Sequence, residues 1–440
     1  MKSDMRDNEQ HSGKWQVSFF SIWTGQAFSL VGSRVAQFAL VWWLTKLTGS
    51  ATVLATASLA ALVPGIVLGP LAGAYVDRWN RRIVMIVADS LIALASLWLV
   101  FLFWAGSIEI WHVYLIMFVR SVGGAFHWPA MQASTSLMVP KEHLSRVAGL
   151  NQAMKGALNI IGPPLGALLL ELVPLYGVMM VDVGTAMLAI LPLFFVHVPQ
   201  PRRKDLAVGK EGKPSIWTDV REGLKYIRNW RGLMILIGFV LIVKIALTPA
   251  FSLLPLLVSD HFQGDAVQLS IMDSVAGVGI VVGGLLLGVW GGFRRKIFTS
   301  MTGMVVLGLG FVVLGLTPST LFWMALGSAL VIGLMLPMVD GPFMAILQGT
   351  VAPEMQGRVF TIISSLLSIS SPIGLAIAGP VSDALGLQVW YLVAGVLCAA
   401  SGLAGFLVPS IVHIEENHGG QITEGPQPTL DAPEVPVAGE

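Results

Sequence analysis

The sequence contains little charge and a single cysteine. Of its 440 residues, 12% are Asp, Glu, Lys or Arg and 55% are hydrophobic, and the mean hydropathy is +0.77. Soluble domains carry about 25% charged residues, so this composition excludes an ordinary soluble enzyme and a disordered chain. The one cysteine, Cys398, lies in an apolar run, which excludes a disulfide-stabilised scaffold.

Sequence motifs of nucleotide hydrolysis, metal binding and covalent catalysis are also absent. No G-x-x-x-x-G-K-S/T loop occurs, and the polar connection 198–231 is too short for a nucleotide-binding domain. The histidines and the cysteine lack metal-ligand spacing, and no Ser/His/Asp set is convincing. We therefore expect no enzymatic activity, no metal and no cofactor. The charges of the chain, +1 in sum, are expected to set topology and not to bind nucleic acid.

Long apolar runs dominate what is present. One bilayer crossing takes about 20 apolar residues, and the chain has room for twelve such helices. The predicted fold class is an all-α integral membrane protein, with twelve transmembrane helices in two six-helix pseudo-symmetric bundles and the lipid bilayer as surroundings. The predicted spans are 17–45, 52–74, 83–104, 111–131, 148–172, 176–197, 232–258, 268–290, 297–316, 321–345, 359–380 and 388–410.

Basic residues predict the orientation in the membrane. Loops on the side of the N-terminus hold five basic clusters, whereas the opposite loops hold only Lys46. The positive-inside rule therefore predicts that both termini are cytoplasmic. The basic clusters are 78–82, 141–146, 202–231, 294–296 and Arg358.

The two halves of the chain repeat each other. Glu142 and Glu354, like Arg82 and Arg294, stand 212 positions apart, which indicates duplication. Within the connecting segment, residues 215–230 have the spacing of an amphipathic helix, for which a solvated linker is favoured over a membrane-surface helix. The predicted organisation is a cytoplasmic N-terminal tail 1–14, a six-helix bundle 15–200, a cytoplasmic linker 201–231, a second bundle 232–411 and a disordered cytoplasmic tail 412–440.

The loop between the second and third spans carries a specific motif. Residues 73–82 read GAYVDRWNRR and resemble the G-x-x-x-D-R-x-x-R-R/K signature of the major facilitator superfamily of transporters. The family usually has Gly where Asn80 stands, and Asn tolerates a left-handed backbone better than any residue except Gly, so the departure is mild. In the family this loop is a conformational latch, with Asp77 expected against the positive N-terminal end of the helix that starts near Val359. The alternative is that the arginines only set topology. The resemblance implies gating roles for Gly73, Asp77, Arg78, Arg81, Arg82 and Arg358.

Two further motifs resemble that family. Arg120 in the fourth span matches the family's buried arginine, and the resemblance implies a part in proton coupling. The fifth span contains Gly156 and then Gly162, Pro163 and Gly166, similar to the motif that marks exporters of the superfamily. Prolines bend a helix and small residues admit a close neighbour, so this run is expected to act as a hinge. A structural arginine and a merely kinked packing helix are the alternatives.

Finer similarity narrows the branch. Residues 20–29, 44–50, 120–130 and 357–360 resemble the macrolide-efflux group of drug:proton antiporters, and the resemblance extends over about residues 15–410. It implies a bacterial cytoplasmic-membrane protein that exports hydrophobic drug-like compounds, macrolide-type antibiotics first, by proton antiport with alternating access. The alternatives are an exporter of an endogenous metabolite such as a siderophore and, more distantly, a non-transporting membrane sensor or scaffold. A monomer is the expected state.

Ionisable residues inside spans are the candidates for proton coupling. Asp182 is the first choice as proton carrier and Asp273 the second, with Arg34 or Arg120 as the modulating cation. Asp89 is expected to stabilise the latch loop, and His127 is expected to be a packing residue. Polar, Trp and Met side chains are the candidates for an adaptable cargo surface. They are Trp23, Gln26, Gln37, Asn151, Gln152, Asn159, Met335 and Met338.

Overall fold

The computed structural model describes residues 2–196, 198–200 and 216–416, and their long elements are all helices. Eleven of these helices are long and apolar enough to span a membrane. The twelfth, α4 (Ile110–Met138), contains Arg120 and two histidines, and it packs lengthwise against α2 and α3. The predicted all-helical membrane fold is therefore confirmed.

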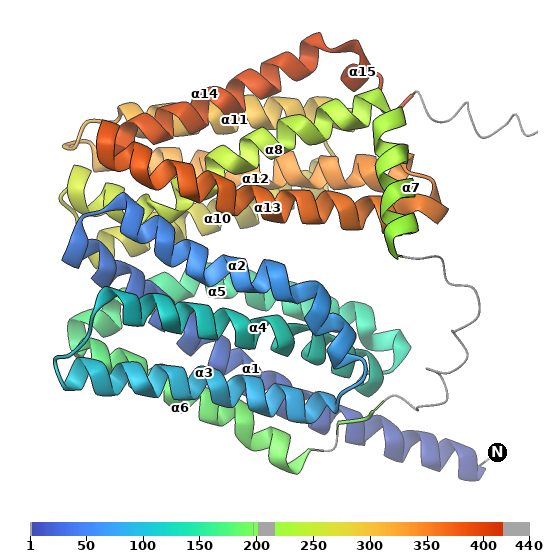
Figure 1. Ribbon diagram of the computed structural model, residues 1–440. Coiled ribbons are helices and arrows are strands. Elements are labelled where there is room, and N and C mark those ends of the chain that lie inside the picture. Colours follow the sequence, from blue (N-terminus) through green and yellow to red (C-terminus); the bar gives the residue numbers. More distant parts are fainter. Residues whose placement is uncertain (1, 197, 201–215, 417–440) are drawn as a thin grey trace, which may run out of the picture.

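The helices form two bundles, one below the other in Figure 1. The second helix of each bundle packs against the fifth helix of the other, α2 against α13 and α5 against α10, as a twofold repeat requires. The first bundle contains α1 (Lys2–Thr48), α2 (Ala51–Val76), α3 (Arg81–Trp104), α4, α5 (Leu144–Leu172) and α6 (Leu175–Phe195). The second contains α8 (Arg231–Ser252), α10 (Ala266–Trp290), α11 (Lys296–Leu316), α12 (Phe322–Thr350), α13 (Pro353–Leu385) and α14 (Leu387–Leu407). Short elements are η1 (Lys141–His143), α7 (Ile216–Asn229), α9 (Leu254–Leu256), η3 (Leu257–His261) and α15 (Pro409–Val412).

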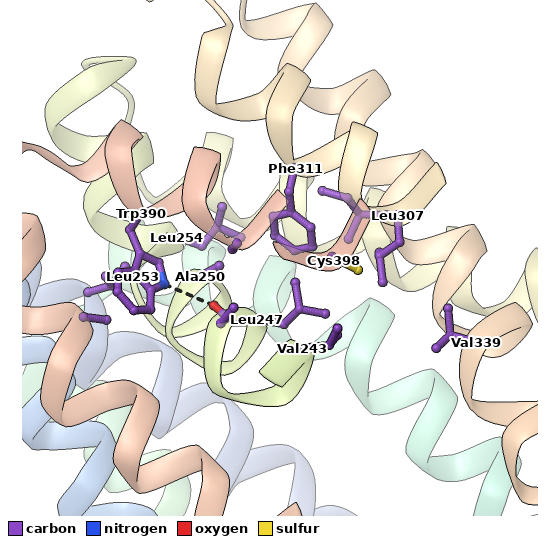
Figure 2. Packing of buried hydrophobic residues seen from close by; sticks show 14 of the residues in the cluster. Val243, Leu247, Ala250, Leu253, Leu254, Leu307, Phe311, Val339, Trp390 and Cys398 are labelled. Atoms are coloured by element: carbon purple, nitrogen blue, oxygen red, sulfur yellow. Dashed lines mark hydrogen bonds between the residues drawn. The ribbon is translucent and has the colours of Figure 1, made fainter. Parts of the chain in front are cut away.

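Small residues let the helices of the second bundle approach closely. A Cβ on Gly308 of α11 would lie 2.5 Å from the backbone oxygen of Gly395 in α14, so the two helices meet backbone to backbone. Figure 2 shows the buried side chains beside this contact, including Phe311 and Cys398. The indole Nε1 of Trp390 donates to the Ala246 oxygen at 3.1 Å, which satisfies its polar atom inside the apolar core.

The amphipathic segment of the linker packs on protein. In α7, Ile227 is buried, and Glu222 accepts a hydrogen bond from Arg358 of α13 at 2.5 Å. The predicted helix is present, but part of its apolar face covers the start of α13, so the helix is not simply solvated. The remainder of the predicted linker, 201–215, lies outside the described residues.

The predicted tail begins too early. Ile411 and Ile414 are fully buried, and Glu415 accepts a hydrogen bond from the backbone N–H of Ile297 at the start of α11, at 2.9 Å. Arg295 pairs with Glu416 at 2.6 Å. Residues 412–416 therefore belong to the second bundle, and the prediction of disorder is wrong for them because the acidic composition concealed the buried Ile414 and the contacts of Glu415 and Glu416 with the start of α11. Residues 417–440 lie outside the described part.

Candidate functional site

The two ends of the helix bundles differ in how the bundles meet. We call the end with the loop 77–80, η1 and the loop 291–295 the basic end, and the end with the loop 49–50 and Gly386 the opposite end. At the opposite end, the carboxylate of Asp383 in α13 accepts hydrogen bonds from three groups at the start of α2. The distances are 2.7 Å to the Ala51 nitrogen, 3.0 Å to the Thr52 nitrogen and 3.0 Å to Ser50 Oγ. A side chain of one bundle thus caps a helix of the other.

Other contacts reinforce this junction. Lys46 Nζ donates to the Gly264 oxygen at 3.3 Å, and a Cβ on Gly379 would lie 2.9 Å from the Thr52 Cα. Ser58 of α2 and Ser252 of α8 share a hydrogen bond of 2.8 Å. Nearer the middle of the helices, Ser274 Oγ donates to the Ile160 oxygen at 2.9 Å. In the described part of the chain, every hydrogen bond between the bundles lies in this half or at this middle contact.

Toward the basic end the facing helices leave open space. A Cβ on Gly69 or Gly73 of α2, on Gly156 of α5, or on Gly284 or Gly288 of α10 would have no neighbour within 4 Å. The same helices are tightly packed at Gly379 and Gly277, farther from the basic end. The structure is therefore closed at the opposite end and separated at the basic end.

The predicted latch loop is bound to its own bundle. Arg81 donates to the Ala133 oxygen of α4 at 2.9 Å, and Arg82 donates to the Leu193 oxygen and, at 2.5 Å, to the Phe194 oxygen at the end of α6. The two bonds of Arg82 lie at the C-terminal end of α6, where cations are favoured. The loop is consequently attached to helices of its own bundle.

Two details of the latch prediction are corrected. Asn80 has φ −68°, so it needs no left-handed backbone; its side chain caps α3 by accepting from the Arg82 and Ile83 nitrogens. The Asp77 carboxylate is 67% exposed and lies 3.8 Å from Arg81 Nη2. Among the described residues Asp77 makes no ion pair or hydrogen bond to α13, because the bundles are separated at this end.

A cavity of about 310 Å³ lies between the bundles near the middle of the helices. It brings together five predicted residues from three helices: Arg34 and Gln37 of α1, Asn159 and Pro163 of α5, and Asp273 of α10. In the described part of the chain no ion pair joins Arg34 and Asp273, although both side chains line the same space. Apolar side chains complete the lining, among them Phe38, Val41, Phe251, Leu269 and Ile280.

The glycines of the exporter-like motif hold α5 against α1. A Cβ on Gly162 would lie 3.3 Å from the Arg34 Cβ, and one on Gly166 would lie 2.7 Å from the Phe38 ring. Two residues that line the cavity are therefore positioned by these glycines. Gly156 has open space instead, and α5 runs unbroken through the motif.

Asp182 and Arg120 form an ion pair inside the first bundle. The Asp182 side chain is 1% exposed and that of Arg120 is 15% exposed. Ser96 Oγ donates to Asp182 at 2.6 Å, Ser33 Oγ donates to it at 3.0 Å, and Arg120 also donates to Ser96 Oγ at 2.6 Å. Four helices, α1, α3, α4 and α6, thus supply one buried polar cluster away from the cavity, and its hydrogen bonds offset part of the cost of burying the charges.

Other predicted cargo residues lie elsewhere. Gln26 is 5% exposed and donates to Asp89 at 2.8 Å, and Met338 is 7% exposed and packs against Gly303 of α11; neither lines the central cavity. Their polar or flexible character suggested a cargo surface because sequence alone did not show which helix face each occupies. Trp23 donates to Asn151 at 2.8 Å. Met335 is half-buried against the core and Gln152 is exposed.

Asp89 does not touch the latch loop, contrary to the prediction. Its second carboxylate oxygen lies 3.4 Å from His127 Nε2 of α4. His127, expected to be a packing residue, is thus part of a second buried polar cluster with Gln26 and Asp89. The spacing of seven residues between Arg120 and His127, two turns on one helix face, was the signal for it.

Comparison with known proteins gives consistent relatives. The model of the Major Facilitator Superfamily matches residues 22–257 and 242–431. Macrolide efflux protein A of Streptococcus pyogenes is 33% identical over 87% of this chain and 94% of its own length. The multidrug efflux pump Tap of Mycobacterium bovis is 26% identical over 90% of this chain and 94% of its own. A solved structure of a bacterial homologue of the iron transporter ferroportin, in an inward-facing state, has a TM-score of 0.66 at 15% identity, covering 88% of this chain and 98% of that one.

Proposed function

Because the chain belongs to the Major Facilitator Superfamily of transporters, we propose that it exports hydrophobic drug-like compounds, macrolide-type antibiotics first, in exchange for protons. The names of two similar proteins, a macrolide efflux protein and a multidrug efflux pump, support this cargo class. The observation that carries the proposal is the cavity between the bundles, where an apolar wall surrounds the side chains of Arg34 and Asp273.

The cavity suits an amphipathic cargo. Ligand pockets of about 300–1,000 Å³ are apolar with a few placed polar groups, and this cavity of about 310 Å³ lies at the lower end of that range. Arg34, Gln37, Asn159 and Asp273 are the polar groups. A macrolide is bulky, so we expect it to occupy the cavity together with the space that opens toward the basic end.

The direction of access follows from the charge distribution. The positive-inside rule assigns the basic end to the cytoplasm, in the bacterial cytoplasmic membrane. The conformation described above then takes up cargo from the cytoplasm, and export requires the bundles to close there and open at the opposite end.

Two aspartates support this alternation. α2 and α13 lie antiparallel, since the start of α2 meets the end of α13 at Asp383. Asp77 immediately follows α2, at the end where α13 begins. When the basic end closes, Asp77 would reach the N-terminus of α13 while Asp383 leaves that of α2. Asp383 of α13 thus caps α2 when the opposite end is closed, and Asp77 at the end of α2 would cap α13 when the basic end is closed.

The coupling between proton and cargo is assigned to Asp182. Protonation of its carboxylate neutralises the partner of Arg120, whose guanidinium stays charged, and so weakens the buried ion pair. Two links lead outward from the pair. Ser33 bonds Asp182 and is followed by Arg34 in the cavity, and Ser121, after Arg120, accepts a hydrogen bond from the Gly65 nitrogen of α2 at 3.2 Å. A change at Asp182 can therefore move both the cavity wall at Arg34 and the helix α2, which carries Asp77 at its end.

The test is uptake of a labelled macrolide into everted membrane vesicles that contain the protein, compared with vesicles that lack it. We expect accumulation that a protonophore abolishes. A lack of accumulation, with insertion verified, would contradict the macrolide assignment, and protonophore-resistant accumulation would contradict proton coupling. A siderophore accumulated in place of the macrolide would favour the metabolite exporter, which the charged pair in the cavity would also suit.

A further inference from the structure

The first bundle contains a second buried polar cluster, which lies between the Asp182 site and the basic end. It consists of Gln26 of α1, Asp89 of α3 and His127 of α4. Gln26 Nε2 donates to one oxygen of Asp89 at 2.8 Å, and His127 Nε2 lies 3.4 Å from the other oxygen. Asp89 is 4% exposed, so its charge would be costly without a proton or a cationic partner. His127 Nε2 is buried and makes no hydrogen bond among the described residues, so Asp89 is the acid that it faces.

The two clusters are in register on the same three helices. Gln26 precedes Ser33 by seven residues, Asp89 precedes Ser96 by seven, and His127 follows Arg120 by seven. Seven residues are about two turns, or roughly 10 Å along a helix, and they return to the same face. Because α4 is antiparallel to α1 and α3, the residue of the second cluster lies nearer the basic end than its counterpart in the Asp182 cluster on each of the three helices.

The surroundings leave few competing charges. α2, which packs on α4, contains no Asp, Glu, Lys or Arg. The charged residue of α6, Asp182, belongs to the cluster with Arg120. The ammonium group of Lys155 in α5 lies 4.3 Å from the centre of the Trp128 ring. The arginines at the start of α3 are committed to carbonyl groups of α4 and α6. Asp89 and His127 are therefore the groups of this layer that can exchange a proton.

We propose that Asp89 and His127 form a second proton-binding site, in series with Asp182, which delivers protons to the basic end separately from the cargo cavity. This inference rests on the proposed proton-coupled export. A proton leaves the Asp182 carboxyl, whose carboxylate pairs again with Arg120, and passes through water to the Asp89–His127 pair. It then leaves to water from His127, whose side chain is 16% exposed against 5% for Asp89. No bond other than those to the proton changes.

The separation of routes has a physical advantage. Cargo in the central cavity displaces water there, so a proton path through the cavity would be blocked when cargo is bound. A path through Asp182, Asp89 and His127 inside the first bundle stays available whether or not cargo is bound. Ser33 and Arg34 are adjacent on α1: Ser33 bonds Asp182 on this path, and Arg34 lines the cavity.

The test uses the full-length protein in proteoliposomes and two readouts. In the first, pH-difference infrared spectra without cargo report protonated carboxyl groups. We expect Asp89→Asn to remove one carboxyl band and His127→Gln to shift the pH at which that band appears. His112→Gln, at the other end of the same helix, is the matched control and should change neither. Bands unaffected by both variants would overturn the proposal, and this result does not depend on knowing the cargo.

The second readout separates coupling from cargo binding. Asp89→Asn and His127→Gln should reduce proton-driven macrolide accumulation to the level seen with a protonophore, while macrolide–macrolide exchange continues. Asp89→Glu should restore accumulation, which shows that a misfolded protein is not the cause. Accumulation at the normal level in both variants would overturn the inferred route. If the unaltered protein moves no macrolide, the proposed function fails, and the infrared result still decides whether this site binds protons.

Discussion

Removal of the Asp383 carboxylate should shift the protein away from the conformation described here. Asp383→Ala deletes three hydrogen bonds at the start of α2, each made to a group of the other bundle. Loss of a helix cap costs about 0.5–2 kcal/mol, and the dipole interaction adds about 0.3–1 kcal/mol. Since the carboxylate is exposed, we take about 1–2 kcal/mol in total, which changes the ratio of the two conformations about 5–30-fold.

Distances between spin labels at the basic end measure this shift. Lys141→Cys and Lys296→Cys place one exposed label on each bundle, and the single native cysteine, Cys398, is fully buried, so labelling is selective. We expect Asp383→Ala to increase the fraction of short distances. Asp265→Ala is the matched control, because Asp265 caps α10 within its own bundle by accepting from the Gln268 nitrogen at 2.8 Å. Equal distance distributions in the protein with and without Asp383 would refute the role of this cap.

Five other substitutions test three features of the structure, two of them as controls. Asp182→Asn should abolish proton-driven macrolide accumulation while an immunoblot shows normal membrane insertion; unchanged drug–proton exchange would eliminate Asp182 as the carrier. Gly166→Ala should lower thermal stability by about 1–3 kcal/mol through overpacking, whereas Gly156→Ala, with open space at that position, should not; equal melting temperatures would contradict the packing described. Glu415→Ala should cost about 1 kcal/mol because it uncaps α11, and Glu416→Ala, which removes an exposed ion pair, should cost less; the reverse order in thermal unfolding would argue against the cap.

Hydropathy and local motifs predicted the helices and the superfamily because both are properties of short segments. An apolar run long enough to cross a bilayer is visible without knowledge of its neighbours. The same holds for the residues 73–82, whose resemblance to the superfamily is confirmed by the family match.

Contacts between residues far apart in the sequence were harder to predict from the sequence. Depth in a span suggested Asp182 and Asp273, but depth does not reveal which face a side chain occupies. The structure places Asp182 inside the first bundle with Arg120, and Asp273 across the cavity from Arg34. The repeat of polar residues every seven positions on three helices was available in the sequence, whereas the cap that Asp383 provides for α2 depends on the packing of two bundles and has no local signal.

The most direct test of proton-coupled export is a measurement of proton movement itself. Purified protein is reconstituted in proteoliposomes that contain a pH-sensitive dye, and a macrolide gradient is imposed without a pH gradient. We predict a macrolide-dependent proton flux opposite to the drug, absent in Asp182→Asn. Macrolide movement with no accompanying change in internal pH would contradict the account.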